Sequence, residues 1–104
     1  MEFIETILFR KRTESLLDDD QLRKLQLTLT FHPDRGVVIP GSGGIRKLRW
    51  VVAGKGKKSG LRIIYYWVTA DHKIYFLTLY KKSYREDLTS EEMKSFKAII
   101  ERED

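Results

Sequence analysis

Four segments of the chain show the apolar pattern of β-strands, and we predict strands at residues 3–9, 45–52, 61–68 and 74–80. Residues 45–52 alternate, with Leu48 and Trp50 on one face and cations on the other. Residues 61–68 are apolar on both faces except for Arg62, and residues 74–80 are similar. The last two segments therefore read as central strands of a sheet.

The hydrophobic period changes to that of a helix after residue 20. Leu22, Leu25 and Leu29 recur on one helical face. The aspartates at 18–20 are candidate N-caps and suit the positive end of a helix dipole. Pro33 disfavours helical backbone in the residue before it, so we expect this helix to end there.

A second helix is predicted near the end of the chain. Thr89 and Glu92 have the spacing of a capping box, in which each side chain bonds the other residue's backbone N–H. The apolar stripe that follows consists of Met93, Phe96, Ile99 and Ile100. This spacing predicts an amphipathic helix that buries one face.

The order of the predicted elements is β-α-β-β-β-α, which indicates the α+β class. We expect a small antiparallel-type sheet with its helices packed on one face. Residues 34–44 hold Pro40 and four of the seven glycines, and we predict a loop there. A length of 104 residues fits a single domain, residues 1–104, with one modest core.

Positive charge is concentrated in the middle of the chain. Residues 41–85 hold eleven Lys or Arg against one acid, Asp71, whereas the segments on either side are net negative. These cations belong to predicted strands and their turns. A folded basic patch indicates a polyanionic partner, most often nucleic acid.

The residue inventory argues against several other classes of protein. There is no cysteine, and no acid lies at metal-ligand spacing from His32 or His72, so we expect neither a metal nor another cofactor. No apolar run reaches 18 residues, which predicts no membrane span. The glycines of residues 41–44 and 54–60 do not match a phosphate-binding loop. We expect a cytoplasmic protein.

Arg62 is the most informative single cation. Burying a charge inside a strand is costly unless it lines a cleft or has an acidic partner, and both explanations are open. Lys47 and Arg49 share a face of one neighbouring strand, and Lys81 and Lys82 end the other. We expect these cations on the sheet face opposite the helices. Such a cluster can cleave RNA without a metal, because it stabilises the charge that develops when the 2′-hydroxyl attacks the phosphate.

Three motifs carry a resemblance to a known family: GGIRKLR at 43–49, SGLRIIYY at 59–66, and YKKS at 80–83 before DLT at 87–89. Together they resemble the RelE/ParE toxin superfamily over roughly residues 3–100. Within it the chain is most similar to HigB-type, RelE-like toxins of bacterial type II toxin–antitoxin systems. The resemblance implies a RelE-like fold and a toxin that cleaves mRNA in the ribosomal A site. It also implies neutralisation by a cognate antitoxin, which we expect to be a helix-turn-helix protein.

The resemblance also implies roles for individual residues. The catalytic cations carried over are Lys47, Arg49, Arg62 and Lys82. Contacts with mRNA or rRNA are expected from Arg46, Lys55, Lys57, Lys58, Lys81, Tyr84 and Arg85. Some relatives stack a C-terminal tyrosine on the base. That position holds Thr89 here, so the role is either absent or taken by Tyr84 or Tyr80.

Two alternatives to a ribosome-dependent endoribonuclease are considered. A ParE-like gyrase poison has no nuclease activity and does not require the Lys47/Arg49/Arg62 cluster. A non-catalytic RNA-binding module would use aromatic side chains as stacking platforms. The candidates for stacking are Trp50, Tyr65, Tyr66 and Trp67. Their place in apolar strands favours core packing instead.

Overall fold

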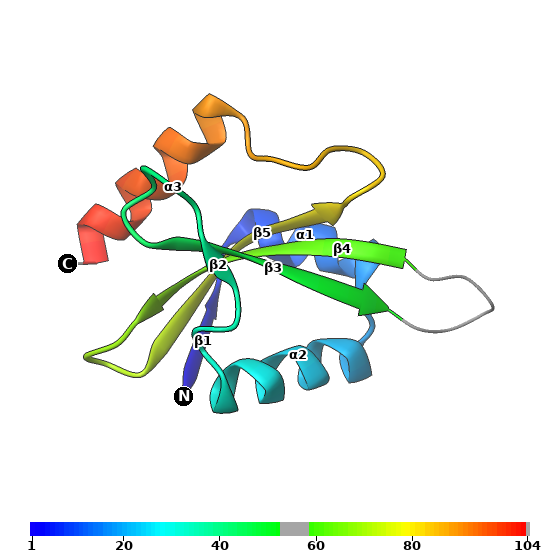
Figure 1. The fold of residues 1–104 in the computed structure, drawn as a ribbon. Helices are drawn as coiled ribbons and strands as arrows, with labels where there is room; N and C mark the ends of the chain where they lie inside the picture. Colours follow the sequence, from blue (N-terminus) through cyan, green and yellow to red (C-terminus); the bar gives the residue numbers. More distant parts are fainter. Residues whose placement is uncertain (53–58, 104) are drawn as a thin grey trace.

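The computed structural model describes residues 1–52 and 59–103. In chain order the elements are β1 (Glu2–Glu5), α1 (Ile7–Leu16), α2 (Asp19–Phe31), β2 (Val37–Val38), β3 (Ile45–Val52), β4 (Ser59–Val68), β5 (Lys73–Lys81) and α3 (Ser90–Glu103) (Figure 1). Within the described residues, three helices and a five-stranded sheet make up the α+β class that the sequence predicts.

The strands lie in the order β1-β5-β4-β3-β2. β3, β4 and β5 pair antiparallel in sequence order, as predicted, and the edge strand β2 pairs antiparallel with β3. β1 instead pairs parallel with β5, so the sheet is mixed at this edge. A parallel pair needs a long crossover between its strands. The chain from α1 to β4 supplies that connection.

Helices cover both faces of the sheet, and the prediction of helices on one face is therefore wrong. Ile63 of β4 packs in one core with Leu25 of α2, whereas the adjacent Ile64 packs in a second core with Phe96 of α3. Successive strand side chains point to opposite faces, so α2 and α3 lie on opposite faces (Figure 1). β4 and β5 are apolar on both faces, and each face needs its own cover.

The first strand is shorter than predicted, because a helix replaces the second half of the apolar run at 3–9. Thr6 is the N-cap of α1: its hydroxyl accepts from the Phe9 N–H at 3.0 Å and donates to the Leu77 carbonyl at 2.8 Å. Phe9 is fully buried and stacks on Phe76, with ring centroids 4.7 Å apart. Thr6 is a residue type that favours the N-cap position, and its place within the run was the signal for this helix start.

The remaining predicted elements are confirmed, with one addition. Asp18 caps α2 by accepting from the Gln21 N–H at 2.8 Å, and α2 ends at Phe31, two residues before Pro33. The predicted bounds of β3 are those observed, and β4 and β5 each extend beyond their predicted segments by one or two residues. The predicted loop at 34–44 contains the two-residue edge strand β2.

The capping box of α3 is present as predicted. The Thr89 N–H donates to the Glu92 carboxylate at 3.0 Å, and the Glu92 N–H donates to the Thr89 hydroxyl at 3.1 Å. Phe96 and Ile100 are buried against the sheet, and Met93 packs beside them. The capping box fixes the point where α3 begins. The segment 82–89, which connects β5 to α3, ends at this point.

Candidate functional site

Strand register gathers three of the four predicted catalytic cations on one face of the sheet. Arg49 of β3 lies directly opposite Arg62 of β4, and Arg62 lies opposite Tyr80 of β5. Lys47 pairs with Ile64, which packs toward α3. The cations therefore lie on the face that carries α3, opposite α2, and the expectation of a face without helices is wrong. This face is not free of helices because α3 covers the second apolar face of the central strands.

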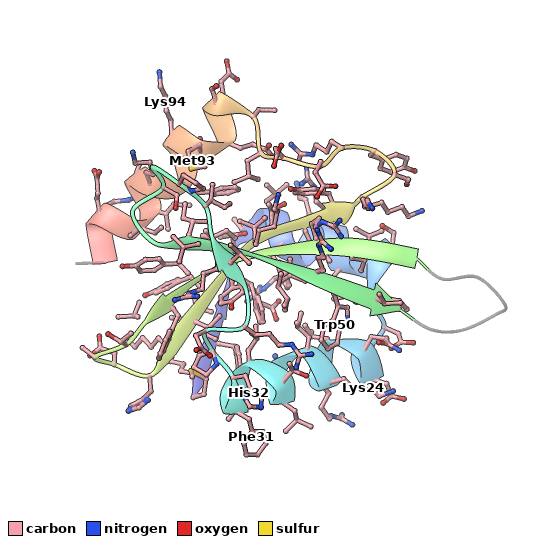
Figure 2. All side chains as sticks on the ribbon, viewed as in Figure 1. Lys24, Phe31, His32, Trp50, Met93 and Lys94 are labelled. Atoms are coloured by element: carbon pink, nitrogen blue, oxygen red, sulfur yellow. The ribbon has the colours of Figure 1, made fainter. Side chains whose placement is uncertain are left out.

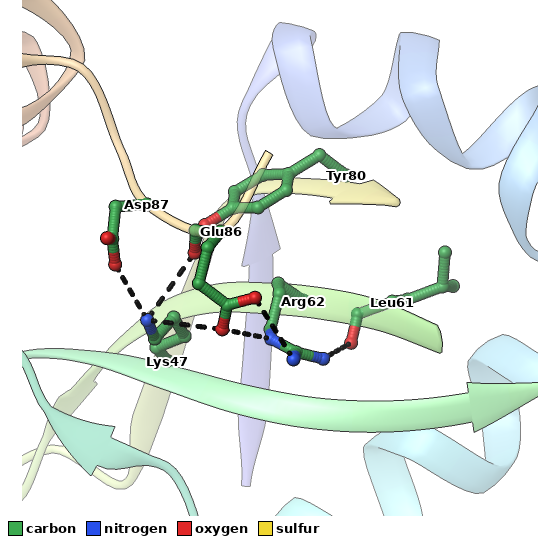
Figure 3. A network of polar contacts seen from close by, with 6 residues as sticks. All are labelled: Lys47, Leu61, Arg62, Tyr80, Glu86 and Asp87. Carbon is green, nitrogen blue, oxygen red and sulfur yellow. Dashed lines mark hydrogen bonds and ion pairs between the residues drawn. The ribbon is translucent and has the colours of Figure 1, made fainter. Parts of the chain in front are cut away.

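A carboxylate from the segment 82–89 lies against two of these cations (Figure 3). The Glu86 carboxylate accepts from Arg62 Nε at 3.2 Å and from Arg62 Nη2 at 3.4 Å. Lys47 Nζ lies 3.9 Å from the same carboxylate and donates to the Glu86 carbonyl at 3.4 Å. Lys47 Nζ also pairs with Asp87 at 2.9 Å. Two strands thus direct cations toward one anionic group.

Arg62 is almost wholly enclosed by this network. The residue is 3% exposed, and its Nη1 donates to the Leu61 carbonyl at 3.2 Å. The side chain of Glu86, in contrast, is 45% exposed. Of the two explanations that the sequence left open for Arg62, the acidic partner is therefore present. The carboxylate and the carbonyl together compensate the desolvation of the buried guanidinium.

A cleft lies beside the network as well. A cavity of about 500 Å³ is lined by Arg35, Val37, Lys47, Leu48, Arg49 and Glu86. Arg49 is exposed in this cleft, and Arg62 lies behind the Glu86 carboxylate. The cleft and the cations next to it form a surface that suits an anionic ligand.

The loop between β5 and α3 is held in place by Tyr80 and Arg85. The Tyr80 hydroxyl donates to the Glu86 carbonyl at 3.0 Å, and burial raises the pKa of this phenol above its usual value. Arg85 pairs with Glu92 through both carboxylate oxygens and lies 4.3 Å over the Tyr80 ring. The Arg85 hydrogen bond lowers the pKa of Glu92 to about 2. Arg85 thus already has an acidic partner within the protein.

The fourth predicted catalytic cation, Lys82, and the other predicted RNA contacts lie apart from the Glu86 network. Arg46 donates to the Asp34 and Gly36 carbonyls at 3.1 Å and 2.7 Å, and so ties down the chain before β2. Lys82 follows β5 and donates its N–H to the Gly60 carbonyl at 3.0 Å. Lys81 and Tyr84 line a different cavity, together with Arg12 of α1. Lys55, Lys57 and Lys58 lie outside the described residues, so their role stays a prediction.

The glycine pair before β3 has a structural role. Gly43 and Gly44 have positive φ values of 79° and 114°, which a side chain would oppose. The buried Ser42 hydroxyl accepts from the Ile45 N–H at 2.9 Å and donates to the Ile39 carbonyl at 2.6 Å. These contacts form the turn that leads into β3. The position of this turn sets the register in which Lys47 and Arg49 pair with β4.

The aromatic residues of the central strands pack in the core, as their apolar context predicted. Tyr65 is fully buried, and its hydroxyl donates to the Pro33 carbonyl at 2.7 Å and accepts from the Gly36 N–H at 2.8 Å. Trp50 lies between β3 and α2 (Figure 2). Trp67 and Tyr66 pack against the two cores. Tyr65 is therefore excluded as a stacking platform.

Sequence reasoning missed Glu86 and Asp87. The basic segment ends at residue 85, and these two acids follow it directly. Their contacts with Lys47 and Arg62 span 24 to 40 residues of sequence. An acidic pair immediately after a run of cations was the available signal.

Among the described residues, no group of three His, Asp or Glu side chains is arranged to hold a metal ion. None of the described helices is long and apolar enough to cross a membrane.

Comparison with known families agrees with the motifs. The family model described as the RelE toxin of the RelE/RelB toxin–antitoxin system matches residues 36–103. The matched region runs from β2 to α3 and contains the whole cationic cluster together with Glu86 and Asp87. It covers well over half of the chain, and the family implies an antitoxin as partner. The chain therefore belongs to the RelE family of toxins from toxin–antitoxin systems.

Proposed function

We propose that this RelE-family toxin is a ribosome-dependent endoribonuclease that cleaves mRNA in the A site and so inhibits translation. The observation that carries the proposal is the convergence of Lys47 and Arg62 on one carboxylate. Two cations from neighbouring strands are positioned to bind a single anionic group. In the proposed reaction that group is the scissile phosphate.

The Glu86 carboxylate marks where the phosphate would bind. Arg62 presents Nε and Nη2 to it as a fork, and such a fork binds a phosphate as well as a carboxylate. Glu86 is half-exposed, so its side chain has solvent to move into when RNA arrives. RNA binding would then exchange an internal ion pair for one with the substrate, while Arg62 stays positioned by the Leu61 carbonyl.

The proposed chemistry uses the nucleophile that RNA itself supplies. The 2′-hydroxyl oxygen bonds to the adjacent phosphorus and the 5′-oxygen leaves, which produces a 2′,3′-cyclic phosphate. Arg62 would stabilise the negative charge of the pentavalent transition state. Lys47 and Arg49 would position the phosphate or exchange protons, and Lys82 would assist. This assignment needs no metal or other cofactor.

The partners follow from the same proposal. The toxin would contact mRNA and rRNA in the cytoplasm, and a helix-turn-helix antitoxin would neutralise it. The motifs GGIRKLR and SGLRIIYY support placing the chain close to HigB-type members of the family. The lysines at 55, 57 and 58 would add contacts with the rRNA backbone.

A translation assay followed by mapping of mRNA 5′ ends tests this function. The wild-type protein should stop translation and create new 5′ ends within mRNA on the ribosome. Inhibition of translation without new 5′ ends would favour a non-catalytic RNA-binding module. A ParE-like poison would leave mRNA intact and would instead cause gyrase-dependent cleavage of DNA. Either of those results would overturn the proposal.

A further inference from the structure

The cleft beside Glu86 contains a cation that the proposed function does not use. Its lining includes Arg35, which lies just before β2, as well as Arg49 of β3. β2 pairs antiparallel with β3, with Val37 opposite Lys47. Continuing this register by two residues along each chain segment brings Arg35 alongside Arg49. Both arginines are exposed, and both line the same cleft.

Arg35 therefore extends a row of arginines across the sheet. Arg49 lies directly opposite Arg62 of β4, so it stands between Arg35 and Arg62 in this row. Like charges in opposite positions of neighbouring strands destabilise a sheet. Glu86 pairs with Arg62, whereas Arg35 and Arg49 have no carboxylate partner among the residues that the structure describes. The row thus carries more positive charge than the acids around it compensate.

The backbone that carries Arg35 is fixed on both sides. The Tyr65 hydroxyl donates to the Pro33 carbonyl at 2.7 Å and accepts from the Gly36 N–H at 2.8 Å. Arg46 Nη1 donates to the Gly36 carbonyl at 2.7 Å. Gly36 lies so close to the Tyr65 ring that an added Cβ would be 2.8 Å from a ring carbon. A cation on such a fixed segment loses less conformational entropy when it binds a ligand.

We infer that Arg35 is a substrate-binding residue that holds the mRNA phosphate next to the scissile one. The inference rests on the proposed function, in which Lys47 and Arg62 bind the scissile phosphate. A single strand carries one phosphate for each nucleotide, so RNA in the cleft brings a neighbouring anion with it. The planar fork of an arginine suits a phosphate. Arg49, between the two ends of the row, stays available to the scissile group.

Binding of single-stranded RNA to the full-length toxin tests this contact. The probe is a fluorescent 2′-O-methyl hexauridylate, which lacks the nucleophile for cleavage, and anisotropy reports its affinity at several salt concentrations. Arg35→Gln should reduce the slope of log K against log salt concentration by roughly 0.7, the value for one phosphate of a single strand. At about 0.1 M salt this corresponds to roughly fivefold weaker binding. Arg35→Lys keeps the charge and should keep the slope.

Arg23→Gln is the matched control, because Arg23 is an exposed arginine of α2, on the opposite face of the sheet. It should leave the slope unchanged. An unchanged slope in Arg35→Gln, or an equal loss in Arg23→Gln, would overturn the inference.

Urea unfolding checks that Arg35 serves binding and not the fold. Because Arg35 belongs to a row of like charges, Arg35→Gln should unfold at the same urea concentration as the wild type or at a higher one. A lower midpoint would identify Arg35 as a residue that stabilises the fold and would also overturn the inference.

Cleavage on programmed ribosomes identifies the phosphate that Arg35 binds. The two phosphodiesters that flank the mapped cut site are replaced, one at a time, by neutral methylphosphonates. One replacement should slow the wild type about fivefold but leave the rate of Arg35→Gln unchanged, since this variant has already lost the contact. If the wild type tolerates both replacements, or if each slows Arg35→Gln equally, the role of Arg35 is rejected while the proposed function stands. If the wild type does not cleave unmodified mRNA, the proposed function fails first.

Discussion

Glu86 serves two roles at the scale of a single residue. It neutralises Arg62, which is 3% exposed. In the proposed function it also occupies the position of the substrate phosphate. A buried cation without a partner is strongly unfavourable, so the folded protein needs this acid when no RNA is present. Bound RNA would supply the same charge in its place. In the proposed function, stability and RNA binding are therefore coupled through one carboxylate.

Replacing Glu86 with Gln should shift these two properties in opposite directions. The amide keeps the size of the side chain but leaves Arg62 without a counter-charge, which should lower the free energy of unfolding by about 1–3 kcal/mol. RNA affinity should rise, because no internal anion then competes with the phosphate. Urea unfolding and RNA titration measure the two effects.

Asp87→Asn is the matched control for this prediction. Asp87 pairs with Lys47 at 2.9 Å, but its side chain is 79% exposed, so its loss should cost less than about 1 kcal/mol. The prediction is contradicted if Glu86→Gln binds RNA more weakly than the wild type, or if the two variants are equally stable.

Arg62→Lys separates the shape of the guanidinium from its charge. Lysine keeps a cation near Glu86 but cannot present the two N–H groups that Arg62 directs at one carboxylate. Cleavage of mRNA on ribosomes should fall by about 10²–10³, the usual cost of one lost transition-state contact. Arg62→Ala should lose at least as much activity and also some stability. A folded Arg62→Lys protein with wild-type activity would remove Arg62 from the catalytic assignment.

At the scale of an element, the start of α3 anchors the loop that carries Glu86. The Glu92 carboxylate accepts from the Thr89 N–H within the capping box and from Arg85 across the loop. A helix N-terminus stabilises such a carboxylate further through its dipole. The element that covers one face of the sheet thus also positions the segment beside the cations.

This arrangement predicts a dependence of stability on pH. The Arg85 hydrogen bond lowers the pKa of Glu92 to about 2 in the folded protein, below its unfolded value of roughly 4.3. The ionised form therefore stabilises the fold above the unfolded pKa, by at most about 3 kcal/mol, and this contribution is lost as the pH falls toward 2. Glu92→Gln should be less stable than the wild type at pH 7, and the difference should shrink between pH 5 and pH 2.

Urea unfolding across this pH range measures the effect. Glu91→Gln is the control, because Glu91 is exposed in the same turn of α3 and no ion pair of it is found among the described residues. It should show little difference from the wild type at any pH. A stability difference for Glu92→Gln that stays constant with pH would show that the Arg85 pair does not contribute in this way.

At the scale of the whole molecule, the proposed chemistry depends on strands that meet only in the folded sheet. Lys47 and Arg62 belong to β3 and β4, and Glu86 follows β5. A cluster of side-chain cations stabilises a charged transition state but supplies no attacking oxygen, so in the proposed reaction the nucleophile is the 2′-hydroxyl of the substrate. This requirement distinguishes it from hydrolysis by an activated water molecule.

A substrate with one 2′-deoxy sugar at the cut site should therefore resist cleavage, whereas the same RNA with the deoxy sugar elsewhere should be cut normally. The expected product ends in a 2′,3′-cyclic phosphate or the 3′-phosphate formed from it, which mass spectrometry of the fragments identifies. Chelators also disrupt ribosomes, so the deoxy substitution is the cleaner test. Efficient cleavage of the deoxy substrate would reject this mechanism in favour of water-dependent hydrolysis.

The elements predicted best from the sequence are those whose signals are local. Asp18 caps α2, Thr89 and Glu92 form the capping box, and the alternation in β3 directs Lys47 and Arg49 to one face. Each of these signals spans at most eight residues and depends only on contacts and geometry within that short stretch. The α+β class follows from them, and the motifs that combine these cations led to the RelE family.

The sequence alone did not determine α1, the parallel edge pair, the placement of α3 or the partner of Arg62. The apolar run at 3–9 suits either a strand or a helix. The change from strand to helix occurs at Thr6, whose hydroxyl bonds the Leu77 carbonyl, 71 residues away. The contact between Arg62 and Glu86 likewise depends on how the segment after β5 returns over the sheet. Local patterns indicate which backbone conformation a segment prefers. The sequence by itself therefore determined α2, α3, the central strands and the family. Only the tertiary structure decided which charges meet, because those distances depend on strand register and on which face each helix covers.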